Sequence, residues 1–368
     1  MTKKSDPPIE PQGKLKELVD ALANVDRLLI LTHNNPDPDS IGSALGLRHV
    51  LQHTTKVKSR LAYGGNVGRA ENRAMITLLR VPIHEITAKQ VARYKNVAIV
   101  DALPDAQNIL APAARSCRIV IDHHLRRAKS KEPPNCFSDF RPQYGATSTI
   151  ITEYVKTNNI PLNARVATAL YYGIKTDIRD LGRDKRDVDL AMMQFLFPKI
   201  SLRWLWKIER TPVPREYFRY FAVAINSAVI VGDAIVSDLG GTDFPEVVAE
   251  MADFLLKVKG MRWSFCVGSK NGKLFFSART LRRGRRAGAL AARLAGRKGS
   301  AGGHDRSAGG IVEADAAPEA EAKARQELIE RFLRSLGREF AAGQGLLPRD
   351  VPPPEERVDE LSENEEKK

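Results

Sequence analysis

The stretch Cys117-Arg118-Ile119-Val120-Ile121-Asp122-His123-His124 combines an apolar, β-branched run with one acid and two histidines. The run predicts a short buried strand. The polar triplet follows at its carboxyl end, where open α/β sheets place their ligand sites. A lone histidine at a strand end is more often a structural residue, so the triplet gains weight if other carboxylates reach the same edge.

Three earlier segments, 27–31, 57–63 and 96–100, have the same strand pattern and alternate with segments of helical periodicity. This alternation predicts an α/β fold with a mainly parallel sheet flanked by helices, whose strand ends meet at one edge. Ser40 is expected to cap a helix over 41–53. The polar residues expected at that edge, in addition to the triplet, are His33, Asp37, Asp39 and Asp101. A further acid, Asp177, is expected in a turn after a helix over 164–172.

Strand and hairpin patterns replace this alternation from about residue 216. Segments 224–231 and 234–237 flank a Gly-Asp turn, and segments 263–268 and 273–278 flank Asn271-Gly272. A smaller α+β domain is therefore expected. The predicted organisation is a disordered tail over 1–12, an α/β domain over 13–195, a helical linker over 196–219, an α+β domain over 220–344 and a second disordered tail over 345–368.

The segment from Gly299 to Gly310 is rich in glycine and contains His304, which favours a phosphate-binding loop over a flexible linker. The arginine run over 282–286 has two open interpretations, a solvated loop face or a contact with nucleic acid. For Trp204 and Trp206, core packing is favoured over stacking on nucleic acid.

The composition is that of a globular protein, because 43% of the 368 residues are hydrophobic. No apolar run approaches the ~18 residues of a membrane span, and the polar start does not resemble a signal peptide, so a cytoplasmic protein is expected. The three cysteines form no C-x-x-C pair and are interpreted as core residues. A net charge of +14 favours anionic partners.

Imidazoles and carboxylates without thiolates suit Mn²⁺, Mg²⁺ or a similar ion and disfavour structural zinc. Two such ions about 3.5–4 Å apart fit hydrolysis at phosphorus, since they activate water and hold the attacking and leaving oxygens. The number of acids and histidines expected at this edge is about sufficient for two divalent cations.

These residues resemble the motifs of the DHH phosphoesterases, in the same order: His33-x3-Asp37-x-Asp39, Asp101, Asp122-His123-His124 and Gly-Ile-x-Thr-Asp177. Pro38 stands where the first motif usually has glycine. Ser277-x-Arg279 with the later Gly302-Gly303-His304 resembles the DHHA1 domain that accompanies them. Within the family the chain is similar to the nano-RNase (oligoribonuclease) and 3′-phosphoadenosine-5′-phosphate phosphatase group.

The resemblance implies a role for each matched residue. One cation would be held by His33, Asp37 and Asp101, and a second by Asp39, Asp101, His123 and Asp177, with Asp101 bridging. His124 would face the scissile phosphate, and Asp122 would orient the cluster. The substrate phosphate would be bound across the cleft between the domains by Arg279, His304 and the amides of Gly302 and Gly303.

The resemblance also implies a phosphodiesterase, dependent on Mn²⁺ with Mg²⁺ or Co²⁺ as alternatives, that releases mononucleotides from short oligonucleotides or dinucleotides. Dephosphorylation of 3′-phosphoadenosine 5′-phosphate is a further expected activity. Two alternatives stay open. One is a single-strand exonuclease acting on longer nucleic acid, and the other is a catalytically silent nucleotide- or RNA-binding protein. Assembly as a homodimer is a further open alternative.

Overall fold

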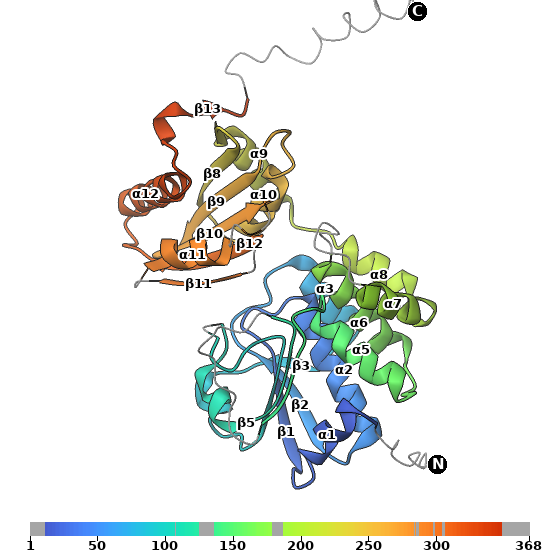
Figure 1. The fold of residues 1–368 in the computed structure, drawn as a ribbon. Coiled ribbons are helices and arrows are strands. Elements are labelled where there is room, and N and C mark those ends of the chain that lie inside the picture. The colour runs from blue at the N-terminus through green and yellow to red at the C-terminus, as the bar shows by residue number, and fades with distance from the viewer. Residues whose placement is uncertain are drawn as a thin grey trace, which may run out of the picture. The chain divides into compact units, whose positions relative to one another are not determined.

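The computed structural model describes residues 12–106, 108–124, 136–178, 187–282, 284, 287–296, 299–303 and 306–347. The chain forms two compact units, which divide between Val213 and Pro214 (Figure 1). This division falls inside the segment 196–219 that is predicted as a linker. Within the described ranges, no helix has both the length and the hydrophobicity needed to cross a bilayer.

The first unit contains a six-stranded sheet in which every neighbouring pair is parallel, in the order β3-β2-β1-β4-β5-β6. Its strands are β1 (Arg27–Leu31), β2 (Lys58–Tyr63), β3 (Ile83–Glu85), β4 (Val97–Val100), β5 (Cys117–Asp122) and β6 (Phe137–Phe140). The predicted α/β class is confirmed, but the sequence prediction missed the short strands β3 and β6. The strand order reverses between β1 and β4, and ligands of open α/β sheets bind in the crevice at such a point.

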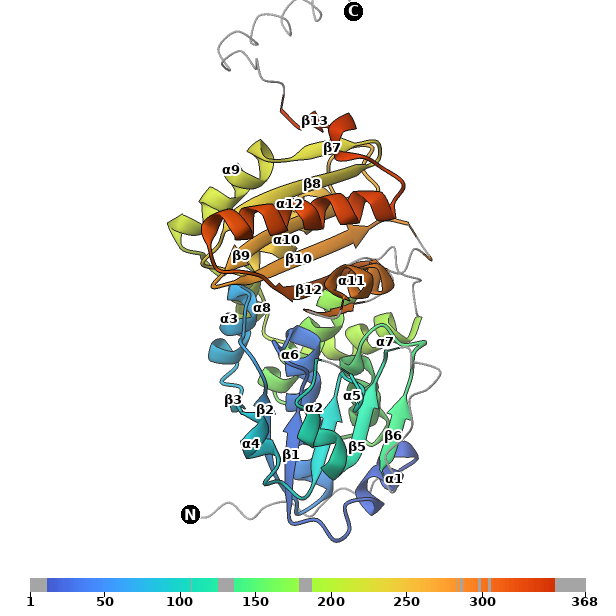
Figure 2. The same cartoon turned by 90° about the vertical axis from the view of Figure 1, so that its left-hand side faces the viewer.

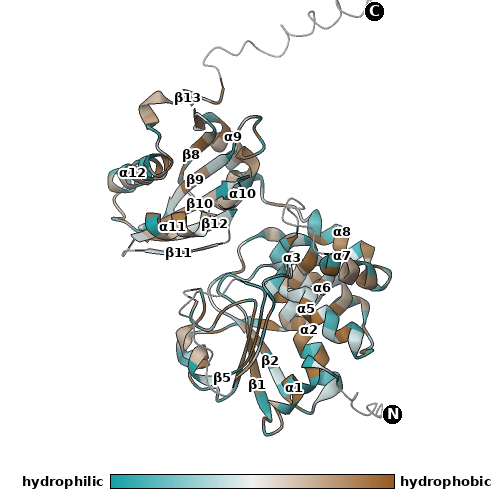
Figure 3. Cartoon of the chain, in the orientation of Figure 1, coloured by the Kyte–Doolittle hydropathy of each residue, from teal (hydrophilic) through white to brown (hydrophobic). Residues whose placement is uncertain are grey.

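Successive residues of β1 face two different cores. Leu28 and Ile30 pack with the larger helices, whereas Leu29 and Leu31 pack with the segment around Val91 and Ala113. Figure 1 views the sheet nearly edge-on with α2, α5 and α6 on one side, and most of β1 is brown in Figure 3. The helices of this unit are α1 (Lys14–Asp20), α2 (Pro38–Thr54), α3 (Ala70–Leu78), α4 (Ala88–Val91), η1 (Ala111–Ser116), α5 (Thr147–Thr157), α6 (Ala164–Asp177), α7 (Asp187–Leu196), η2 (Phe197–Lys199) and α8 (Leu202–Glu209).

The second unit contains a seven-stranded mixed sheet in the order β11-β12-β10-β9-β8-β7-β13. Its elements are η3 (Arg215–Phe218), α9 (Arg219–Asn226), β7 (Val229–Val231), β8 (Ala234–Gly241), α10 (Val247–Leu255), β9 (Trp263–Lys270), β10 (Lys273–Thr280), α11 (Ala287–Ala295), β11 (Gly299–Gly303), β12 (Ser307–Glu313), α12 (Pro318–Ser335), η5 (Phe340–Ala342) and β13 (Gln344–Gly345). Helix α12 lies across the sheet (Figure 2), and its Phe332 stacks on Phe265. The expected hairpins β7–β8 and β9–β10 are present.

Three predictions for the second unit are corrected by the structure. The segment 224–231 is a strand only over β7, because Ala224–Asn226 end α9. The glycine-rich segment forms the antiparallel strands β11 and β12, since glycines also fit where strand backbones approach closely. Gly345, expected in the disordered tail, pairs with Val229 in β13. Residues 1–11 and 348–368 of the predicted tails lie outside the described residues.

Candidate metal centre

The segment after β1 begins helix α2 with an acidic cap. The Asp37 carboxylate accepts the Ser40 backbone N–H at 2.9 Å, so Asp37 is the N-cap in place of the predicted Ser40. Pro38 then occupies the first helical turn, where its fixed φ and missing N–H are tolerated. The departure from the family's glycine therefore suits the helix start. Asp39 follows as a fully buried residue.

Asp101 directly follows β4 and has a backbone φ of 58°, in the left-handed region that aspartate tolerates better than most residues. Its N–H donates to the Ile121 carbonyl at 3.0 Å, which keeps the turn tied to β5. The carboxylate is 2% exposed and lies between two imidazoles. One of its oxygens lies 3.6 Å from His33 Nε2, and the other lies 3.5 Å from His123 Nε2. This is the arrangement that a bridging carboxylate requires.

The predicted ligands, together with His124, gather in three overlapping groups that share Asp101 or His123. His33 Nε2 lies 3.6 Å from Asp37, and His123 Nε2 lies 3.2 Å from Asp177 and 4.0 Å from Asp39. In each of the triads His33–Asp37–Asp101, Asp39–His123–Asp177 and Asp101–His123–His124, the nearest ligand atoms all lie within 4.8 Å of one another. The structure brings all six predicted metal ligands together, and their ion binding stays a prediction. Asp177 ends helix α6, whereas the sequence placed it in a turn.

Hydrogen bonds to backbone carbonyls orient the imidazoles of His33 and His123 toward the carboxylates. The Nδ1 atom of His33 donates to the Asn34 carbonyl at 2.9 Å, and that of His123 donates to the Tyr144 carbonyl at 3.2 Å. Each Nε2 atom then faces the carboxylate cluster. Hydrogen bonds of this kind commonly hold the histidines of metal sites.

The start of helix α5 supports the same cluster, although the sequence analysis assigned it no role. The Asp39 carboxylate accepts the backbone N–H groups of Thr147 and Ser148 at 2.7 and 2.8 Å. Thr147 Oγ1 donates to Asp101 at 2.9 Å. A helix N-terminus favours negative charge, so α5 stabilises the buried Asp39. The signal available in the sequence was the short Gly-Ala-Thr-Ser helix start.

His124, which belongs to the third triad, forms a pair with Asp122. Asp122 is fully buried, and its Oδ1 accepts the backbone N–H of His124 at 3.2 Å and the Nδ1 proton at 2.6 Å. Burial opposes the charge of both groups, but their mutual attraction wins: it lowers the pKa of Asp122 and raises that of His124. The His124 side chain is 30% exposed, so it is accessible as a proton donor.

The cluster concentrates negative charge in a buried site. Burial and the neighbouring carboxylates raise the pKa of Asp39 and outweigh the opposing effect of His123. Burial opposes the charge on His33 and His123, yet the surrounding carboxylates raise the pKa of both imidazoles well above the ordinary value. Protons thus neutralise this cluster, and a cation that binds here must displace them.

Family models match both units of the chain. The model described as "DHH family, N-terminal domain" matches residues 27–174, and the model described as "DHHA1 domain" matches residues 232–332. The chain carries a DHH domain and a DHHA1 domain. This confirms the resemblance at the level of the two domains, whereas the likeness to the nano-RNase group stays a prediction.

Two curated proteins are similar to the chain over more than two thirds of its length. The uncharacterized protein MJ1633 of Methanocaldococcus jannaschii is 34% identical over 254 residues, which are 69% of this chain and 52% of that protein. The cyclic-di-AMP phosphodiesterase GdpP of Geobacillus thermodenitrificans is 27% identical over 73% of this chain and 42% of that protein. The chain thus spans about half the length, or less, of these two curated relatives.

A solved structure shares the fold. The exopolyphosphatase-related protein from Bacteroides fragilis superposes with a TM-score of 0.66 at 17% identity, over 88% of this chain and 97% of that one. Such a likeness concerns the arrangement of the elements alone.

The DHHA1 domain carries the residues predicted to bind substrate. Arg279 in β10 donates to Asp253 at 2.5 Å and to Ser277 Oγ at 2.6 Å. Gly302 and Gly303 belong to β11 and pair with Gly309 and Ala308 of β12. His304 lies outside the described residues. The role of these four residues in substrate binding stays a prediction.

Gly173 lets α6 approach α2 and α5 closely. A Cβ atom there would lie 2.5 Å from Ser148 Oγ, 3.0 Å from the Pro38 carbonyl oxygen and 3.1 Å from Asp39 Cα. The Gly173→Ala variant is expected to lose about 1–3 kcal/mol of unfolding free energy, as overpacked cores do. Its Mn²⁺ affinity should also fall, because Asp39 and Asp177 lie on the helices forced apart. Denaturant unfolding and calorimetric Mn²⁺ titration measure the two effects.

The matched control is Gly241→Ala in the DHHA1 domain, where a new Cβ would have no neighbour within 4 Å. We expect this control to retain both stability and Mn²⁺ affinity. A Gly173→Ala variant as stable as the control would contradict the tight packing.

Metal affinity is expected to depend on pH. His33 and His123 must lose the Nε2 proton to bind a cation, and their raised pKa values make that proton harder to displace as the pH falls. Between about pH 8 and about pH 6, Mn²⁺ affinity should drop by about tenfold per pH unit for each displaced proton. Calorimetry in two buffers of different ionisation enthalpy counts the released protons. An affinity that is constant across this range would contradict proton displacement.

Proposed function

We propose that this chain is a Mn²⁺-dependent phosphodiesterase that hydrolyses dinucleotides and very short oligonucleotides to mononucleotides. The observation that carries the proposal is the position of Asp101, which belongs to one triad with His33 and Asp37 and to another with His123 and His124, and whose two oxygens face different histidines. Shared carboxylates of this kind hold the paired ions of many phosphoesterases. The similarity to a named cyclic-di-AMP phosphodiesterase supports a substrate with phosphodiester bonds.

The donor set also supports the choice of metal. Two imidazoles and four carboxylates, with no thiolate among them, suit Mn²⁺ better than Zn²⁺ or Ca²⁺. His33, Asp37 and Asp101 would hold one ion, and Asp39, His123 and Asp177 would hold the other together with Asp101. A pair of divalent cations supplies a water of lowered pKa and neutralises charge on the phosphate.

Residues of the chain orient the catalytic side chains, and His124 would supply a proton. Asp122 fixes the His124 ring through Nδ1 and contributes to the raised pKa of this imidazole. The raised pKa favours the protonated ring, which would donate a hydrogen bond to a phosphate oxygen and a proton to the leaving oxygen. The contacts from α5 and Tyr144 keep Asp39 and His123 in place during turnover.

The deciding experiment is product analysis on a substrate panel with Mn²⁺, Mg²⁺ or a chelator. The panel contains a dinucleotide, a pentamer, a 20-mer, 3′-phosphoadenosine 5′-phosphate, a cyclic dinucleotide and pyrophosphate. Mononucleotide release from the dinucleotide, with Mn²⁺ as the best metal, is the expected result. Tight Mn²⁺ binding without turnover of any substrate would instead support a silent nucleotide-binding protein.

A second candidate function, exonuclease action on longer single strands, is favoured by one feature of α8. Trp206 is 60% exposed, so its predicted core packing is wrong, and the Arg210 guanidinium lies 5.8 Å from its ring centre. Arg203 and Lys207 are also exposed on this helix. An exposed aromatic ring among basic side chains can stack a base and bind the backbone of a single strand.

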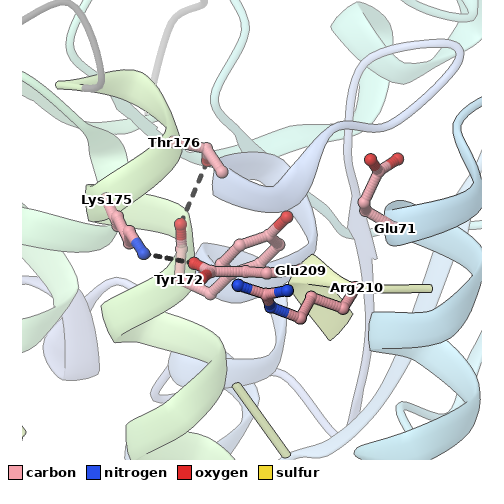
Figure 4. Close-up of a pocket in the computed structure, with 6 residues that line it drawn as sticks. All are labelled: Glu71, Tyr172, Lys175, Thr176, Glu209 and Arg210. Atoms are coloured by element: carbon pink, nitrogen blue, oxygen red, sulfur yellow. Dashed lines mark hydrogen bonds and ion pairs between the residues drawn. The ribbon is translucent and has the colours of Figure 1, made fainter. Parts of the chain in front are cut away.

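A cavity of about 280 Å³ lies beside this helix and is lined by Glu71, Tyr172, Lys175, Thr176, Glu209 and Arg210 (Figure 4). Lys175 pairs with Glu209, which ties the end of α8 to the last turn of α6. Asp177 ends that same turn. Helix α6 therefore contacts α8, which carries the exposed Arg203 and Lys207, and also contributes Asp177 to the candidate metal centre.

The Trp206→Ala variant separates the two functions. An exonuclease that uses α8 should lose activity on the 20-mer, keep activity on the dinucleotide and respond steeply to salt. If the variant handles both substrates like the wild-type chain, with little salt dependence, the dinucleotide proposal is favoured.

A further inference from the structure

Two cysteines meet at the amino ends of β5 and β6. Cys117 is the first residue of β5, and Cys136 directly precedes β6. Their Sγ atoms lie 3.3 Å apart and share a hydrogen bond. Both side chains contact the core on the α4 side of the sheet, Cys117 as a buried residue and Cys136 as a partly exposed one. The sequence analysis interpreted them only as core residues.

We propose that Cys117 and Cys136 are a disulfide site that cross-links β5 to the edge strand β6 when a small disulfide oxidant is present. A disulfide bond is ~2.05 Å long, so the sulfur atoms need to approach by only about 1.2 Å from their separation of 3.3 Å. The third cysteine, Cys266, lies buried in β9 of the DHHA1 domain. It therefore serves as an internal reference for thiol reactivity.

Oxidised glutathione is a suitable oxidant, and the exchange balances in two steps. The more exposed Cys136 loses its proton to solvent, attacks one glutathione sulfur and releases the first glutathione thiolate. Cys117 then loses its proton, attacks the Cys136 sulfur of the mixed disulfide and releases the second thiolate. Cys136 is the first nucleophile because it is partly exposed, whereas Cys117 is buried and its hydrogen bond with Cys136 raises the pKa of its thiol.

The cross-link would act on the part of the sheet that carries the DHH motif. Residues 118–135 lie between the two cysteines in the chain and include Asp122, His123 and His124. Strand β6 is the outermost strand and pairs only with β5 within the described sheet. The segment after β6 brings the Tyr144 carbonyl to His123. A covalent link at the opposite end of this strand pair therefore holds the pairing in register and leaves the metal ligands untouched.

The test compares the full chain before and after incubation with oxidised glutathione. We expect the intact mass to fall by two hydrogen atoms, and peptide mapping to find a Cys117–Cys136 link while Cys266 stays reduced. The melting temperature should rise by about 5 °C, because the link constrains the unfolded chain, and dithiothreitol should reverse the rise. None of these readouts depends on enzymatic activity.

Three serine variants complete the test. Cys117→Ser and Cys136→Ser should abolish both the link and the rise, and Cys266→Ser should retain both. The proposal is overturned if glutathione adducts persist on the wild-type chain without a cross-link. It is also overturned if the linked chain melts at the temperature of the reduced chain.

Discussion

The Asp101→Asn variant is expected to lose at least about a hundredfold in kcat on a dinucleotide, since even residues that only support metal ligands contribute 10–100-fold. Asp101 lies at the centre of the cluster, with one oxygen facing His33 and the other facing His123. Asparagine keeps the size of the side chain but removes the negative charge and one oxygen ligand. The left-handed φ of 58° is compatible with asparagine, so the fold should persist.

Calorimetric Mn²⁺ titration of the same variant measures the cause directly, and we expect both ions to bind more weakly. The control is Asp20→Asn, which removes an exposed carboxylate from α1 and should match the wild-type chain. Retention of full turnover in the Asp101→Asn variant would remove the basis of the two-ion proposal.

The Arg141→Met variant is expected to lose about 3–5 kcal/mol of unfolding free energy, as happens when one partner of a buried ion pair is removed. Arg141 binds both oxygens of Asp139 at 2.8 Å and also donates to Glu153 and to the Tyr144 hydroxyl. Asp139 is only 5% exposed, so without the arginine it loses the positive charge that pairs with it and keeps the hydrogen bond from Tyr154. Denaturant unfolding measures the loss.

This variant should also bind Mn²⁺ more weakly while folded, because Arg141 holds the turn whose Tyr144 carbonyl orients His123. Arg165→Met, which removes an exposed arginine from α6, is the matched control for both measurements. In the double variant Asp139→Asn with Arg141→Met, the buried charge is absent and part of the stability should return. If the double variant is no more stable than Arg141→Met, the buried-charge explanation is wrong.

Local patterns in the sequence were sufficient to predict a strand or helix wherever the hydrophobic residues followed one clear pattern. Strands β1, β4 and β5 each contain an apolar run, 28–31, 97–100 and 119–121, and all three strands were expected. Strand β6 has the sequence Phe-Ser-Asp-Phe, in which the polar residues hide the strand pattern. Its Asp139 is buried because Arg141 and Tyr154 bind it. The end of α9, Ala224–Asn226, was included in a predicted strand because its apolar residues lead directly toward the β-branched residues of β7.

The sequence by itself determined the residue types of the candidate site and the two-domain organisation. Motif spacing and strand ends depend on residues that are close in the chain, and the sequence gives the order of those residues directly. Only the tertiary structure decided that the Asp101 backbone turns left-handed, that α5 begins on Asp39 and that Cys117 meets Cys136. Such contacts join residues that are distant in the chain, and they are set by how strands and helices pack, which no local pattern encodes.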